Sequence, residues 1–173
     1  MAGMKWIKTY HAVLASPIGS NGLVAGHFMW VAIRLALVGL VFGVVSALLG
    51  AMSITSALSI VPIVILVGLA MASPMTAFTA TRAAAEGLTA VFRFTVTPMF
   101  LFSGTFFPIS QLPGWMQPLA AATPLWHAVE LARSIALGVD SALPAWQHLA
   151  YLVALLAARA ALSIQIFRQK LLP

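Results

Sequence analysis

The feature that most constrains the fold is a run of 47 residues, 35–81, that contains no charged side chain. A single helix over this run would extend about 70 Å at 1.5 Å per residue, whereas the hydrocarbon core of a bilayer is about 30 Å thick. The run must therefore fold back on itself, and the small, polar residues 50–56 are the best place for a turn. We expect two antiparallel membrane helices, residues 28–49 and 57–78.

Composition extends this conclusion to the whole chain. Apolar residues make up 62% of the sequence and charged residues 7%, whereas soluble domains carry about 25% charged residues. The basic residues are scattered at the ends of apolar runs and not gathered on one face, so we expect no nucleic-acid partner. The absence of cysteine from the sequence excludes disulfides and thiol catalysis. The expected fold class is an all-α, polytopic transmembrane helical bundle that forms a single domain over residues 1–173.

Two further spans are predicted, over residues 90–107 and 145–167. Four spans place both termini on one side of the membrane. That side would carry seven cations, against Arg133 alone on the other, and the positive-inside rule then puts both termini in the cytoplasm. The seven cations are Lys5, Lys8, Arg34, Arg82, Arg93, Arg168 and Lys170.

Residues 108–144 are apolar yet rich in proline, with Pro108, Pro113, Pro118 and Pro124 close together. Proline inside a helix removes a hydrogen bond and clashes with the preceding turn, so this stretch cannot form a hairpin of two spans. Its tryptophans and leucines fit a solvated loop equally poorly. Irregular backbone at membrane depth is tolerated only where it is buried in protein or lines a cavity. We therefore predict an outer re-entrant element of short helices at the mouth of a pathway.

Two motifs in this chain are distinctive. One is "FLFSGTFFPISQLPGWMQ" followed by "TPLWHAVELAR", and the other lies in "KTYHAVLASPIGSNGLVAGHFMWVAIRL". Both resemble the type 2 ABC transporter permeases, in the branch that exports lipooligosaccharides and nodulation factors and is related to polysaccharide and drug exporters. In the second motif Tyr10, Leu14 and Pro17 match the family pattern, and Ser16 takes the place of its threonine. This segment follows the second membrane helix of the family, so we expect the chain to be N-terminally truncated relative to the family.

The resemblance implies a permease subunit of an ATP-driven exporter that moves an amphipathic or lipid-linked substrate out of the cytoplasm of a bacterium, across its inner (plasma) membrane. Two permease copies would pair, each with a separate cytoplasmic ABC ATPase subunit. The ATPase would bind ATP and Mg, and we expect no cofactor and no enzymatic activity in this chain, which lacks a G-x-x-x-x-G-K-[ST] loop. Residues 1–26 would be a cytoplasmic coupling segment. Its predicted contact residues are Tyr10, His11, Leu14, Ser16 and Pro17.

The resemblance also assigns an outer gate to the re-entrant element and the residues that lead into it. The predicted gate residues are Ser103, Gly104, Phe106, Phe107, Pro108, Leu112, Pro113, Gly114, Pro124, Glu130 and Arg133. Two other functions remain open. A non-transporting scaffold or inactive truncated paralogue would keep these motifs without activity. A secondary transporter would usually carry ionisable groups in mid-membrane, and only Arg159 qualifies.

Several residues allow two interpretations. Glu130 and Arg133 are one helical turn apart, so they could form a local ion pair or bind substrate head groups. Arg159 could have a structural partner in the bundle or line the pathway. The Gly39-x-x-x-Gly43 motif lets two helices approach closely, either within one subunit or between two.

Two further hypotheses concern aromatic and histidine residues. The five tryptophans fall near span ends or in the outer element, as in an aromatic belt. Ser103 with His127 and His148 could suggest an intramembrane serine protease, but that requires a hydrogen bond between nucleophile and base, which spacing alone does not predict. Isolated histidines without metal-ligand spacing predict no metal site.

Overall fold

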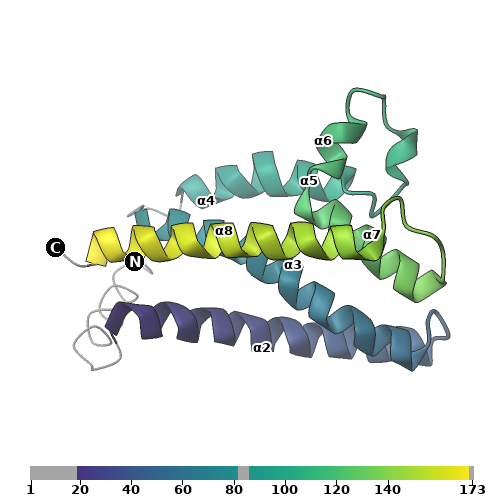
Figure 1. Cartoon of the computed structure of the whole chain (residues 1–173), viewed down its shortest axis with the longest axis horizontal. Coiled ribbons are helices and arrows are strands. Elements are labelled where there is room, and N and C mark those ends of the chain that lie inside the picture. Colours follow the sequence, from purple (N-terminus) through teal and green to yellow (C-terminus); the bar gives the residue numbers. More distant parts are fainter. Residues whose placement is uncertain (1–18, 82–85, 172–173) are drawn as a thin grey trace.

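The structure is a computed structural model that describes residues 19–81 and 86–171, all of its regular elements being helices (Figure 1). This confirms the all-α helical bundle. In chain order the elements are α2 (Gly19–Leu48), α3 (Ile54–Thr81), α4 (Glu86–Val91), η1 (Phe92–Val96), α5 (Thr97–Phe102), η2 (Ile109–Gln111), α6 (Gln117–Ala121), α7 (Pro124–Leu137) and α8 (Ala145–Leu171).

Within residues 19–81 and 86–171, three helices contain stretches that are long and apolar enough to cross a membrane. These stretches are Ala25–Leu48 in α2, Ile54–Met75 in α3 and Ala145–Leu162 in α8. α3 packs against both α2 and α8. In Figure 1 the start of α2 and the end of α8 lie at one end of the bundle, and the α2–α3 turn, α6 and α7 lie at the other.

The segment predicted as the span 90–107 forms a composite helix, α4–η1–α5, that ends at Phe102. Its apolar part, Thr89–Phe102, is shorter than the three long helices. η1 is a π-helical turn, in which the backbone N–H of Thr97 donates to the carbonyl of Phe92. The helix ends at Phe102, with Ser103 as its C-cap, because Gly104 follows with a positive φ of 86°, a conformation that a helix cannot contain. The whole composite helix is about 25 Å long, and its crossing of the membrane stays a prediction.

The Gly39-x-x-x-Gly43 motif lies in the interface between α2 and α3 of the same chain. A Cβ atom added at Gly43 would lie 3.1 Å from the Cβ of Ala57, and one added at Gly39 would contact Val64 and Val61. The small residues therefore let α2 and α3 approach closely. Of the two interpretations of this motif, the structure shows packing within one subunit.

The buried core lies where α7 packs against α3 and α8. It consists of Ile63 from α3, Ala128 and Leu131 from α7, and Leu152 from α8. Leu66, Val67, Ile135 and Tyr151 pack around it. The short helix α7 is thus held between two of the long helices, at the end of the bundle that also carries the α2–α3 turn (Figure 1).

Candidate functional site

The outer element is centred on α7, whose ends are fixed by its sequence. The Thr123 hydroxyl accepts a hydrogen bond from the backbone N–H of Trp126 at 3.3 Å and caps the helix. Pro124 occupies the first helical position, where no N–H is required. At the other end Gly138 adopts a left-handed conformation, with φ of 66°, and donates to the Ser134 carbonyl. The helix is only about 21 Å long, so it cannot cross the bilayer.

The turn that leaves α5 is built from buried small residues. The Ser103 hydroxyl, fully buried, donates to the Phe100 carbonyl at 3.0 Å and shares a second hydrogen bond, of 2.8 Å, with the Thr105 hydroxyl. Gly104 lies against the Trp126 ring, and its positive φ favours glycine at this position. The chain then reverses through η2 towards α6. There the Gln117 side-chain amide donates to the Leu112 carbonyl at 2.9 Å.

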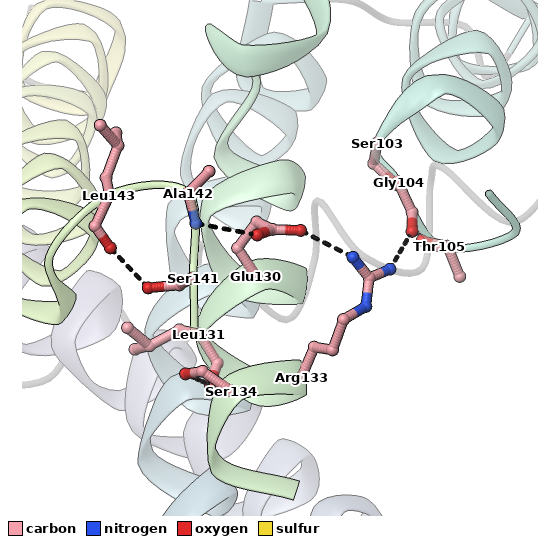
Figure 2. Close-up of polar contacts among 10 residues, drawn as sticks. All are labelled: Ser103, Gly104, Thr105, Glu130, Leu131, Arg133, Ser134, Ser141, Ala142 and Leu143. Atoms are coloured by element: carbon pink, nitrogen blue, oxygen red, sulfur yellow. Dashed lines mark hydrogen bonds and ion pairs between the residues drawn. The ribbon is translucent and has the colours of Figure 1, made fainter. Parts of the chain in front are cut away.

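Glu130 and Arg133 connect three segments of the outer element (Figure 2). The Arg133 guanidinium donates to the Glu130 carboxylate at 2.7 Å and, through its other terminal nitrogen, to the Gly104 carbonyl. The second oxygen of Glu130 accepts from the backbone N–H of Ala142 at 3.4 Å. Charge-assisted bonds are stronger than neutral ones. The pair therefore fastens α7 to the turn after α5 and to the loop before α8.

A second cluster connects α7 to α8. His127 and His148 share a hydrogen bond of 2.8 Å between their Nδ1 atoms, and one ring must donate while the other accepts. The Tyr151 ring stacks on His127 with 3.9 Å between centroids, and its hydroxyl donates to the Ala122 carbonyl. Trp126 contacts both imidazoles. The cluster is an aromatic joint between the outer helix and the last long helix.

Burial and the neighbouring His148 lower the pKa of His127 to about 4, against a weaker opposing contribution from the backbone at Ala121. The His127 ring is therefore neutral near neutral pH. Ser103 is hydrogen-bonded to Phe100 and Thr105, and each histidine to the other. The hydrogen bonds of these three residues thus give no support to a serine protease.

The structure places the predicted gate residues in three different environments. Gly104, Glu130 and Arg133 belong to the network of Figure 2, and Ser103 lies beside it, bonded to Thr105. Two other gate residues are buried. The remaining five lie in the loop after α5, where Phe107 is half-buried and the other four are exposed. The buried ones are Leu112 and Pro124, and the loop residues are Phe106, Phe107, Pro108, Pro113 and Gly114. Their role in gating stays a prediction.

Other predicted residues lie elsewhere. Tyr10, His11, Leu14, Ser16 and Pro17 are outside the described residues. Arg159 contacts α3, away from the outer element.

Two features of this site were missed by sequence analysis. The assignment of Trp126 to an aromatic belt is wrong, because the side chain is only 3% exposed and lies among Gly104 and the two histidines. Trp30, Trp115 and Trp146 are exposed. The hydrogen bond between His127 and His148 joins positions 21 apart in sequence. No local pattern indicates such a pair.

The chain is similar to a known protein family and to several known proteins. Residues 4–137 match the ABC-2 type transporter family. The chain is 35% identical over 137 residues to nodulation protein J of Rhizobium meliloti (strain 1021). The aligned residues make up 79% of this chain and 52% of that relative. The chain is 32% identical over 169 residues to nodulation protein J of Rhizobium leguminosarum bv. trifolii, covering 98% of this chain and 64% of the relative.

A third relative is nodulation protein J of Bradyrhizobium diazoefficiens, 31% identical over 167 residues, or 95% of this chain and 63% of the relative. The chain thus spans about half to two thirds of the length of the curated relatives that it matches. No solved structure matches it significantly.

Proposed function

The chain belongs to the ABC-2 type transporter family, and from this premise we propose that it is the permease subunit of an ATP-driven exporter. The family match runs from residue 4 to residue 137 and so includes the outer element up to the end of α7. This family match and the three apolar helices of spanning length among the described residues identify the chain as a multi-pass membrane protein of a transporter family. The proposed substrate is amphipathic or lipid-linked, and the proposed direction is out of the cytoplasm.

The observation that carries this proposal is the position of α7. The helix is too short to cross the bilayer, yet its buried face packs between α3 and α8. The loop before it is tied to the helix through Arg133 and Gly104. Such an element lies at membrane depth only where protein or a cavity surrounds it, and this arrangement suits the exit of a substrate pathway.

The energy source in this proposal is a separate subunit. A cytoplasmic ABC ATPase would bind ATP and Mg, and a second permease copy would complete the pathway. Residues 1–26 would form the coupling segment, with Tyr10, His11, Leu14, Ser16 and Pro17 nearest to the ATPase. Both termini would lie in the cytoplasm beneath the bacterial inner membrane, in accord with the seven cations on that side.

Affinity purification of the tagged chain from mild detergent tests this proposal, with partners identified by mass spectrometry. We expect a near-stoichiometric ABC ATPase that is lost when residues 10–17 are scrambled. The matched control is Arg133→Ala, which changes the outer element and should retain the ATPase.

Two results would contradict the proposal. If no ATPase is recovered under conditions in which a nodulation protein J relative retains one, the chain is a scaffold or an inactive paralogue. If the purified chain alone supports flux driven by a proton or sodium gradient, it is a secondary transporter.

A further inference from the structure

Helix α3 contains two prolines in its interior, Pro62 and Pro74. Proline has no N–H and cannot donate to the carbonyl four residues earlier. Pro74 therefore leaves the carbonyl of Ala70 without its helical donor. Ala70 is fully buried, and the bilayer interior offers no water to replace that donor.

The replacement comes from α8. The Arg159 guanidinium donates to the Ala70 carbonyl at 3.0 Å, and the same nitrogen lies 3.8 Å from the Met71 sulfur. Arg159 lies in the stretch of α8 that is long and apolar enough to cross the membrane, where a guanidinium is costly unless it is paired. The Ala70 carbonyl, which Pro74 deprives of its helical donor, thus receives a hydrogen bond from Arg159.

The contact also lies at a defined distance from the outer element. Ile63 and Leu152, which hold α7 in the core, are each seven residues before Ala70 and Arg159 in their helices. Seven residues are two turns, or about 10 Å. α3 and α8 therefore contact each other at two positions. One is the apolar core around Ile63 and Leu152, against which α7 packs, and the other is the hydrogen bond from Arg159 to Ala70, about two turns further along both helices.

We propose that Arg159 is a positioning residue, which supplies the hydrogen bond that Pro74 removes from α3 and thereby fixes α3 against α8 beneath the outer helix. This assigns to Arg159 a partner within the bundle and not a contact with substrate. The proposal concerns contacts within this chain and does not depend on the proposed transport function.

A double-mutant cycle tests the inference. Arg159→Met removes the donor but keeps an extended apolar side chain, and Pro74→Ala restores an N–H that can donate to Ala70. We expect R159M to lower the midpoint of thermal unfolding in detergent by about 4 °C or more. In the P74A background the same change should cost less than half of that shift.

Pro62→Ala is the matched control, because Pro62 removes the donor of Leu58, which lies twelve residues, or about 18 Å, before Ala70 in the same helix. P62A should leave the effect of R159M unchanged. Equal effects of R159M in the wild-type and P74A backgrounds, or no effect in either, would overturn the proposal. If R159M does not fold, R159K is compared in its place. Lysine keeps a donor but reaches the carbonyl with a different geometry, so its effect should be smaller than the one expected for R159M and should again be reduced by P74A.

The position of α7 provides a second readout. The sequence contains no cysteine, so Ala128→Cys introduces a single thiol into the buried face of α7. We expect maleimide to label this thiol slowly, several-fold faster in the R159M variant, and slowly again once P74A is added. A labelling rate that R159M leaves unchanged would show that Arg159 does not position the outer helix. A change in substrate preference with unchanged stability would instead place Arg159 in the pathway.

Discussion

At the scale of single residues, the outer element depends on a few side chains that each make two contacts. Arg133 bonds to Glu130 and to Gly104, and Glu130 also accepts from Ala142. The spacing of Glu130 and Arg133 predicted the ion pair, since residues three apart lie on the same helix face. The contact with Gly104, 29 residues earlier, could not be predicted, because it depends on how α7 packs against the turn after α5.

The first prediction concerns Arg133. Arg133→Ala should lower the unfolding midpoint by about 2–4 °C, which corresponds to roughly 1 kcal/mol for a chain of this size. Arg133→Lys should recover only part of the loss, because an ammonium cannot reproduce the planar fork that serves two acceptors. Thermal unfolding in detergent measures both shifts. Arg93, exposed on η1, is the control, and an equal shift for Arg93→Ala would show that the loss follows from charge alone.

The second prediction concerns pH. The pKa of His127 is lowered to about 4 in the folded protein, whereas an unfolded histidine titrates near 6.5. Between these two pKa values the unfolded chain therefore binds more protons than the folded chain. The contribution of His127 to the free energy of unfolding is complete above about pH 6.5 and is lost as the pH falls towards 4.

The unfolding midpoint measured against pH checks this directly. The wild-type curve should fall more steeply between pH 6.5 and 4 than that of His127→Gln, and the two should run parallel above pH 6.5. Parallel curves for wild type and H127Q over the whole range would refute the assignment.

At the scale of helices, the charge-free run of 47 residues predicted α2 and α3 and the turn between them. Such a run is informative because the bilayer limits helix length. The end of the following helix was harder to predict. Residues 103–107 contain neither a charged residue nor a proline, but the buried turn at Ser103 and Gly104 ends the helix at Phe102. Hydropathy does not reveal a turn that side-chain hydrogen bonds stabilise.

The third prediction concerns the α2–α3 interface. Gly43→Leu should separate the two helices, because even a Cβ atom at this position would lie 3.1 Å from Ala57. Gly26→Leu, on the same helix, is the matched control, because a Cβ added there meets no atom within 4 Å. We expect a fall in the unfolding midpoint for G43L that is several times that for G26L. Similar values for the two variants would mean that Gly43 does not mediate close packing.

At the scale of the whole molecule, composition and charge predicted the class of protein, and two motifs indicated the family to which residues 4–137 belong. The prolines of residues 108–144 predicted short helices in place of further spans, and α6 and α7 are such helices. Sequence alone could not predict that α7 packs between α3 and α8. Nor could it predict that Arg159 supplies the donor that Pro74 removes, since both depend on which helices become neighbours.

The central claim about the whole molecule is that residues 108–144 lie on the outer side and do not cross the membrane. Because the sequence contains no cysteine, single cysteines at Ala51, Gln111 and Asp140 can be labelled with a membrane-impermeant maleimide in right-side-out vesicles. Lys8→Cys and Lys170→Cys mark the predicted cytoplasmic side. We expect the first three to react in intact vesicles and the last two only after permeabilisation. Labelling of Gln111 and Asp140 from opposite sides would contradict the account, because the outer element would then cross the membrane.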